Sequence, residues 1–255
     1  MCRHVAYLGP PIPLADLLFT PPHSLSRQSW APRDMRGGGT INADGFGIAW
    51  FQGQEQPIQY RRSCPLWTDA ALPRLAAATR SGAILAAVRS ATVGLPVTET
   101  AAAPFAEGRW LFSHNGVVAG WPDSVTGLAA TLPVRDLLTL DAPTDSALLW
   151  ALVRARLRAG EKPGTALAAV VADVAAAAPG SRLNLLLTDG ETIAATTYGH
   201  SLSYLARIPS TADASVLVAS EPLDPDPGWI PVPDHSLLVA APTAATVTAL
   251  EGALS

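Results

Sequence analysis

Cys2 is the residue whose type and position offer the most chemistry, because it stands directly behind Met1. Methionine aminopeptidase removes an initiator methionine when the next side chain is small, and cysteine qualifies. Removal would leave a thiol nucleophile and a free α-amino group on one residue. An α-amine titrates near pH ~7.7–8.0, so part of it is an uncharged base at neutral pH. A nucleophile that uses its own amine as base is a route to covalent catalysis. Because a second-position cysteine also occurs by chance, this prediction needs partners elsewhere in the chain.

The dipeptide Asn115-Gly116 offers chemistry that complements such a nucleophile. Acyl transfer needs hydrogen-bond donors aimed at the developing oxyanion, and an asparagine amide with a glycine N–H supplies two. Asn-Gly is also the dipeptide that type I′ hairpin turns favour. Taken alone, the dipeptide predicts a turn more strongly than an oxyanion hole.

Two charged residues could bind an amino-acid substrate. Arg89 follows six apolar residues, and its planar guanidinium suits bidentate binding of a carboxylate; an arginine that ends a strand and faces water explains it equally well. Asp145 could pair with an ammonium group, but an acid at this place also complements a helix N-terminus. For Asp145 alone, the helix interpretation is favoured. Arg3 and His4 alternate along a strand, and we expect a surface arginine and an ordinary histidine without catalytic roles.

Composition limits the possible partners. Of the 255 residues 49% are apolar and 15% charged, with a net charge of -4. The absence of basic runs argues against a nucleic-acid partner. No apolar run reaches ~18 residues and no basic-apolar leader is present, so neither a membrane span nor a signal peptide is expected. Cys2 and Cys64 form no disulfide framework or zinc spacing, which favours a reducing, cytoplasmic location. Nothing calls for a metal or an organic cofactor.

The candidate residues recur at the ends of expected elements. Apolar runs bounded by glycine and proline predict strands, and a good N-cap predicts the start of a helix. Cys2 precedes a strand at 5–8, Arg89 follows one at 83–88, Asn115 follows one at 110–113, and Asp145 opens a helix at 144–157. Further helices are expected at 14–19, 68–79 and 165–176, and further strands at 48–51, 215–219 and 236–240. Residues 222–233 are expected to form a loop. The glycine-rich stretch Gly37–Gly39 is a candidate for a mobile loop.

Asp189-Gly190 between apolar runs at 183–188 and 192–197 is a strong hairpin signal, so antiparallel pairing is expected. Two facing sheets with helices outside would bury this many strands. No repeat or linker is visible, which predicts a single domain over residues 2–255.

The ordered set of motifs resembles the class II glutamine amidotransferases, which are N-terminal-nucleophile hydrolases. The motifs are Met1-Cys2-Arg3, Asn42 to Gly47 (NADGFG), Arg89 to Thr92 (RSAT), His114-Asn115-Gly116 and Thr144-Asp145-Ser146. Four further segments spread over nearly the whole chain: MCRHVAYLG at the start, VRSATVG, SHNGV and SEPLDPDPGW. These segments resemble the γ-glutamyl amidohydrolases of the ergothioneine pathway. Those enzymes remove glutamate from γ-glutamyl-hercynylcysteine sulfoxide. The resemblance implies an α+β fold, a four-layer αββα sandwich of two mainly antiparallel sheets.

The resemblance also implies roles for individual residues. Cys2 would be the nucleophile and its α-amine the general base, while Asn115 and Gly116 would form the oxyanion hole. The α-carboxylate of the glutamyl group would bind Arg89, and its α-ammonium Asp145. Thr92 would line the same pocket. The partner is then a small γ-glutamyl compound, and the expected reaction passes through a γ-glutamyl thioester.

Two departures from the family pattern keep alternatives open. Amidotransferases that deliver ammonia usually carry histidine where this chain has Val93, and we expect no synthase domain to be attached. A hydrolase is therefore expected, ahead of a glutaminase subunit that feeds ammonia to a partner synthetase. A catalytically silent γ-glutamyl-binding module of the same fold ranks last.

Overall fold

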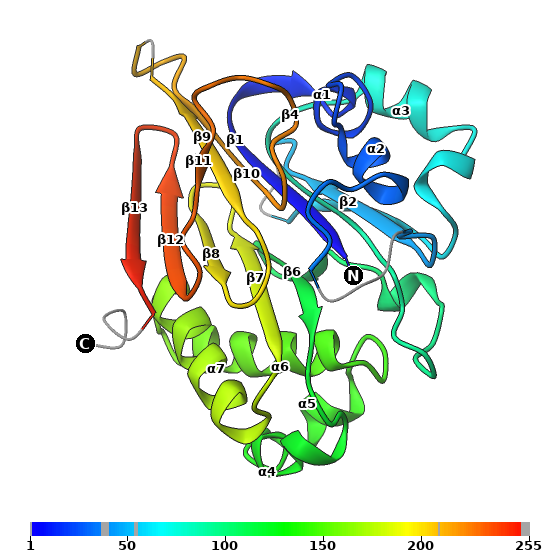
Figure 1. The fold of residues 1–255 in the computed structure, drawn as a ribbon, viewed down its shortest axis with the longest axis vertical. Coiled ribbons are helices and arrows are strands. Elements are labelled where there is room, and N and C mark those ends of the chain that lie inside the picture. The colour runs from blue at the N-terminus through cyan, green and yellow to red at the C-terminus, as the bar shows by residue number, and fades with distance from the viewer. Residues whose placement is uncertain (1, 37–40, 54–55, 209, 251–255) are drawn as a thin grey trace.

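The computed structural model describes residues 2–36, 41–53, 56–208 and 210–250. Met1 and the expected mobile segment at 37–39 lie outside this part of the chain. Within it, two antiparallel sheets pack face to face, with helices on both outer faces (Figure 1). One sheet has the strand order β11-β9-β10-β1-β4-β2-β3, and the other has the order β13-β12-β8-β7-β6-β5.

The first sheet contains β1 (Arg3–Pro13), β2 (Phe46–Trp50), β3 (Ile58–Arg62), β4 (Arg80–Val88), β9 (Ser203–Arg207), β10 (Ser215–Ala219) and β11 (Ile230–Pro231). The second contains β5 (Phe105–Glu107), β6 (Trp110–Val117), β7 (Arg182–Thr188), β8 (Ile193–Thr197), β12 (Ser236–Ala241) and β13 (Ala244–Ala249). The helices are α1 (Ala15–Leu18), α2 (Leu25–Trp30), α3 (Leu72–Ala78), α4 (Thr126–Ala129), α5 (Val134–Leu138), α6 (Asp145–Arg158) and α7 (Pro163–Ala177).

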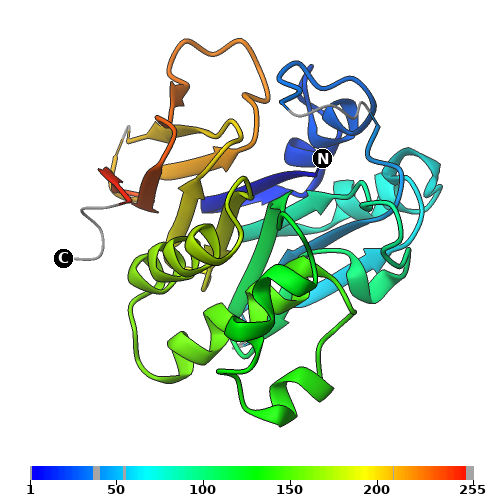
Figure 2. The same ribbon diagram turned by 60° about the horizontal axis from the view of Figure 1, so that its bottom comes forward.

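The layers follow from which face of each strand is apolar. Along β1, Val5 and Tyr7 pack into the core beneath α1, α2 and α3, whereas Ala6 and Leu8 pack into the core between the sheets. This alternation is what a strand buried on both faces requires. A third core lies between the second sheet and the pair α6 and α7, which Figure 2 shows crossing the front of the molecule. The expected four-layer αββα sandwich is therefore confirmed.

Most expected elements are present, with shifted ends. The hairpin at Asp189-Gly190 joins β7 to β8, and the Asp189 carboxylate accepts hydrogen bonds from the N–H groups of Glu191 and Thr192. Helix α3 begins four residues later than predicted because Asp69 accepts the N–H groups of Ala71 and Leu72, which starts the helix there. The loop expected at 222–233 is interrupted by β11 at its end, where Ile230 and Pro231 pair with β9.

Candidate active site

Cys2 lies directly before β1, whose first residue is Arg3. The strand is central in its sheet, between β10 and β4, and its pairing with β4 begins at Arg3 opposite Val88. Cys2 is half-buried and lines a pocket together with Arg89, Ser113, His114 and Ser146 among others. The pocket has a volume of about 20 Å³, which admits about one water molecule. The nucleophile candidate thus shares a pocket with the carboxylate-binding candidate.

His114 stands in the Cys2 pocket but has no free lone pair. Its Nε2 lies 3.0 Å from the Arg182 carbonyl oxygen, which can only accept, so Nε2 carries the proton and donates. Its Nδ1 lies 2.9 Å from Ser146 Oγ and therefore accepts from that hydroxyl. Burial also lowers the pKa of His114. The imidazole joins Ser146 to the Arg182 main chain and leaves the role of base to another group.

Asn115 and Gly116 do not form the hairpin turn that the dipeptide favours, so that prediction is wrong. Both lie inside β6, where Asn115 pairs with Asn184 and Gly116 with Leu183 of β7. The ladder continues through them because Gly116 has no side chain: a Cβ there would meet the Arg182 carbonyl oxygen at 1.8 Å. Glycine is thus needed for close approach of two strands.

The Asn115 amide is buried, and most of its hydrogen-bonding capacity is unsatisfied. The side chain is 1% exposed, its Oδ1 has no partner, and its Nδ2 donates one long bond of 3.5 Å to Ser220 Oγ. The same hydroxyl accepts the His4 N–H at 3.0 Å, two residues along the chain from Cys2. Buried amides normally fill their hydrogen-bonding capacity, so spare capacity beside the start of β1 indicates a place for a further polar group.

Arg89 is held at the end of β4 by the segment around Asp44 and Gly45. Its N–H donates to the Gly45 carbonyl at 2.8 Å, and its own carbonyl accepts from Asp44 N–H at 3.0 Å. The Asp44 carboxylate caps the next turn by accepting from Ala91 N–H at 2.8 Å. The guanidinium is nearly buried and donates to the Pro96 carbonyl at 2.8 Å. Thr92, by contrast, is exposed and does not line the Cys2 pocket.

Asp145 is buried at the first turn of α6, next to Ser146 of the Cys2 pocket. Its Oδ2 accepts from Val118 N–H at 3.1 Å, and its Oδ1 accepts from Ser146 N–H at 2.8 Å. Thr144 is the N-cap, as predicted, and accepts from Ala147 N–H. The Asp145 carboxylate itself does not line the pocket. It ties the chain after β6 to the start of α6.

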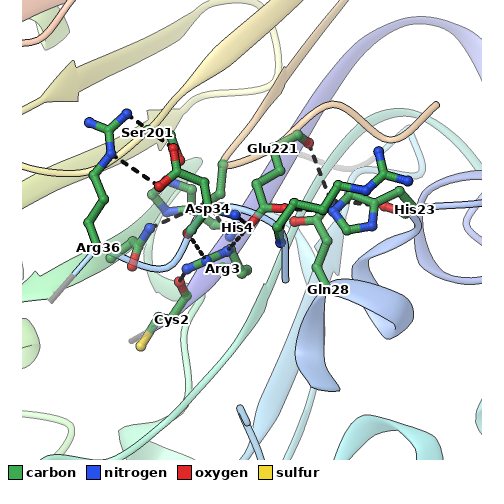
Figure 3. Close-up of polar contacts among 12 residues, drawn as sticks. Cys2, Arg3, His4, His23, Gln28, Asp34, Arg36, Ser201 and Glu221 are labelled. Carbon is green, nitrogen blue, oxygen red and sulfur yellow. Dashed lines mark hydrogen bonds and ion pairs between the residues drawn. The ribbon is translucent and has the colours of Figure 1, made fainter. Parts of the chain in front are cut away.

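The expectation of a surface arginine at position 3 is wrong. Arg3 is 2% exposed, and its Nε donates to Glu221 Oε1 at 2.8 Å (Figure 3). Its Nη1 donates to the Cys2 carbonyl at 2.9 Å, and its Nη2 donates to the Asp34 carbonyl. One buried guanidinium therefore fixes the main chain of the nucleophile candidate.

Glu221 is the centre of this cluster. Besides Arg3, it accepts from His23 Nε2 at 2.6 Å, from Arg33 N–H at 2.8 Å and from Asp34 N–H at 3.3 Å. Burial opposes ionisation, but the hydrogen bonds of His23 and the Arg33 N–H and the charge of Arg3 outweigh it and lower the pKa of Glu221 to about 2. The carboxylate is therefore ionised at neutral pH.

Glu221→Gln is expected to destabilise the protein by about 3–5 kcal/mol, because it leaves the buried Arg3 charge without its partner. Denaturant unfolding at neutral pH measures this loss. The matched control is Glu191→Gln, which removes the exposed partner of Arg109 and should cost less than about 1 kcal/mol. Equal effects of the two substitutions would contradict the account of the cluster.

Two buried histidines near the site make stability depend on pH. Burial is the largest cause of the lowered pKa of His4, which is about 3. The pKa of His200 is also lowered to about 3, first by burial and then by the positive charge of Arg182. Unfolded histidines take up protons below their ordinary value of 6.5, while these two stay neutral in the folded state. The unfolded state therefore binds more protons between pH 6.5 and 3, so stability rises with pH in that window.

The free energy of unfolding is thus expected to fall on acidification from pH 6.5, by up to about 1.4 kcal/mol per pH unit for each of the two histidines. Denaturant titrations between pH 7 and 5 measure the slope. His200→Gln should reduce it, because this variant lacks the buried imidazole. An unchanged slope in His200→Gln would contradict a neutral buried histidine.

The sequence alone did not point to Glu221, Asp34 or Ser220 as neighbours of the nucleophile. Arg3 and Glu221 are 218 positions apart, and no local spacing joins them. Within the described part of the chain, no group of three or more histidine, cysteine or acidic residues is placed to hold a metal ion. No helix there is long and apolar enough to cross a membrane.

The chain is similar to proteins of one family along most of its length. The family model of class II glutamine amidotransferases matches residues 19–214. The chain is 42% identical to γ-glutamyl-hercynylcysteine sulfoxide hydrolase of Mycolicibacterium smegmatis, covering 98% of this chain and 100% of that protein. The hydrolase of the same name from Mycobacterium tuberculosis is also 42% identical, with 99% and 98% covered.

Among solved structures, a glutamine aminotransferase class-II domain protein from Silicibacter pomeroyi superposes with a TM-score of 0.67. It is 25% identical and covers 98% of this chain and 99% of its own. The match of the family model over most of the chain and the full-length relatives identify the fold of N-terminal-nucleophile hydrolases. The chain belongs to the class II glutamine amidotransferase family.

Proposed function

We propose that this protein hydrolyses the γ-glutamyl amide bond of γ-glutamyl-hercynylcysteine sulfoxide and releases glutamate and hercynylcysteine sulfoxide. The observation that carries the proposal is the placement of Cys2 in one pocket with Arg89, while the neighbouring His114 has both ring nitrogens engaged. A thiol without a side-chain base fits an enzyme that uses its own α-amine. The substrate comes from the two relatives that carry this activity in their names.

In the proposed reaction the Cys2 thiol gives its proton to the α-amine and attacks the γ-carbonyl carbon. The Asn115 amide and the Gly116 N–H stabilise the tetrahedral oxyanion. As the C–N bond breaks, the protonated amine donates its proton to the leaving nitrogen. Water then attacks the γ-glutamyl thioester, and Cys2 is regenerated with release of glutamate.

Substrate binding is proposed to rest on the amino-acid end of the glutamyl group. Arg89 would bind its α-carboxylate, Asp145 its α-ammonium, and Thr92 would close the same site. Arg89 has the better support because it is among the residues that line the Cys2 pocket. Since that pocket holds about one water molecule, the glutamyl group enters only when the Arg89 side chain and its neighbours move apart.

Arg89→Lys is expected to lower kcat/KM for γ-glutamyl substrates by about 10–100-fold, mainly through KM, because lysine loses the bidentate fork. Steady-state kinetics measure the change. Arg74→Lys, an exposed position in α3, is the control and should keep the parent values. Parent-like KM in Arg89→Lys would argue against carboxylate binding at this residue.

A substrate panel tests the proposed function. Purified protein is incubated with γ-glutamyl-hercynylcysteine sulfoxide or with free glutamine, and released glutamate and ammonia are measured. The proposal expects fast release of glutamate from the first compound and little ammonia from the second. Faster release of ammonia from glutamine would instead support the glutaminase subunit.

We also propose a cytoplasmic location, where Cys2 stays a free thiol; Cys2 and Cys64 are not joined in a disulfide.

A further inference from the structure

The hydroxyl of Ser220 joins the two sheets beside the start of β1. Ser220 directly follows β10 and is fully buried. Its Oγ accepts the His4 N–H of the first sheet at 3.0 Å, and it also accepts from Asn115 Nδ2 of the second sheet at 3.5 Å. One hydroxyl therefore links the strand that follows Cys2 to the amide proposed for the oxyanion hole.

The Ser220 oxygen has a set position relative to Cys2. Besides accepting the His4 N–H, Ser220 donates its own N–H to the His4 carbonyl at 3.0 Å, so two hydrogen bonds join these residues. The next residue, Glu221, binds the Arg3 guanidinium that donates to the Cys2 carbonyl (Figure 3). The main chain on both sides of Arg3 is thus tied to the dipeptide that carries the hydroxyl.

The orientation of the Asn115 amide depends on this oxygen. The last torsion of an asparagine side chain is broad, so hydrogen bonds decide where its N–H groups point. Among the described residues, the contact with Ser220 is the single hydrogen bond of the amide, because Oδ1 has no partner. Catalytic hydrogen bonds are often long before substrate binds, and this contact is long too. A catalytic group has to lie within about 0.5 Å of its productive position, which an unanchored amide would not do.

We propose that Ser220 is a positioning residue of the oxyanion hole. Its oxygen has two lone pairs: one accepts the His4 N–H, and the other accepts one N–H of the Asn115 amide. The second N–H of the amide is thereby held for the oxygen of the γ-carbonyl group. This inference rests on the proposed function, because it concerns the oxyanion of the same hydrolysis.

Ser220→Ala is expected to lower kcat about tenfold or more, because the amide stays but loses its orientation. The loss should be smaller than the about 10²–10³-fold that removal of the amide itself would cause. KM should stay near the parent value, since the amide acts on charge that develops in the transition state. Ser220→Cys keeps the side-chain volume but has only a weak sulfur acceptor, so it should show the same loss and replaces the alanine variant if that variant does not fold. Glutamate release from γ-glutamyl-hercynylcysteine sulfoxide measures both constants.

The double variant Asn115→Ala/Ser220→Ala separates positioning from a purely structural role. Once the amide is absent, removal of the hydroxyl should cost nothing further in kcat, because Ser220 acts only through that amide. A structural role would instead lower kcat by the same factor in both backgrounds. The value of kcat is expressed per folded molecule, with the folded fraction taken from denaturant unfolding of the same preparation.

Ser81→Ala is the matched control. Ser81 is a buried serine near the start of β4, the end away from Arg89, and its hydroxyl also accepts a main-chain N–H, that of Ala83. The control should lose stability and keep the parent kcat. Parent kcat in Ser220→Ala, or equal factors in the two backgrounds, would overturn the positioning role while leaving the hydrolase intact. A parent enzyme that does not cleave γ-glutamyl-hercynylcysteine sulfoxide would overturn the proposed function and this role with it.

Discussion

Cys2→Ala is expected to abolish release of glutamate, with turnover at or near the uncatalysed rate. The substitution removes the only atom proposed to form the thioester, and nucleophile removal in covalent hydrolases costs about 10⁴–10⁶-fold in kcat. The fold should persist, since Cys2 precedes β1 and the ladder with β4 starts at Arg3. Release of glutamate and the unfolding midpoint are measured on the same preparation.

Cys64→Ala is the matched control, because it removes the second half-buried thiol, which packs near the core beneath α1–α3. It should keep the parent turnover. The Cys2→Ala protein should also fail to trap a γ-glutamyl group when substrate is added and the reaction is quenched with acid. Substantial turnover in Cys2→Ala would exclude this residue as the nucleophile.

Asn115→Ala is expected to lower kcat by about 10²–10³-fold, which corresponds to about 2.7–4 kcal/mol of lost oxyanion stabilisation. KM should change much less, because the interaction strengthens only as charge develops on the oxygen. The amide is free for this role, since its single donated bond is 3.5 Å long. Asn115→Asp should be at least as impaired, because a carboxylate cannot donate.

The cross-strand neighbour Asn184 provides a control with the same side chain and burial. Its amide is fully engaged: Oδ1 accepts from Tyr198 and His200 N–H groups, and Nδ2 donates to the His200 carbonyl. Asn184→Ala should therefore lower stability while the folded fraction keeps most of its kcat. Parent-like kcat in a folded Asn115→Ala protein would remove Asn115 from the oxyanion hole.

Local patterns predicted the elements that present the site. The apolar run before Arg89, the N-cap at Thr144 and the Asp189-Gly190 hairpin each depend on neighbours within a few residues, and all three are confirmed. The layer order followed from the number of buried strands and the two adjacent helices. Short-range physics was sufficient for these features because strands such as β4 and β7 are buried along nearly their whole length.

Features set by distant parts of the chain were not predictable in this way. Asn115-Gly116 has the composition of a turn, but pairing with β7 keeps it in a strand. Arg3 has the charge of a surface residue, but Glu221, brought by the chain after β10, gives it a buried partner. In both cases a tertiary contact outweighs the local preference. The roles of Thr92 and Asp145 in substrate binding stay predictions, since they were inferred only from the order of the family motifs.

The central claim is that the α-amine of Cys2 acts as the base for its own thiol. A chain carrying a protease-removable N-terminal extension tests this most directly, because cleavage directly before Cys2 frees the amine without changing any side chain. Glutamate release from γ-glutamyl-hercynylcysteine sulfoxide is measured before and after cleavage, with alkylation of Cys2 as a check that the thiol is accessible in both forms. The account predicts turnover only after cleavage. Equal turnover by the extended and the cleaved protein would contradict it.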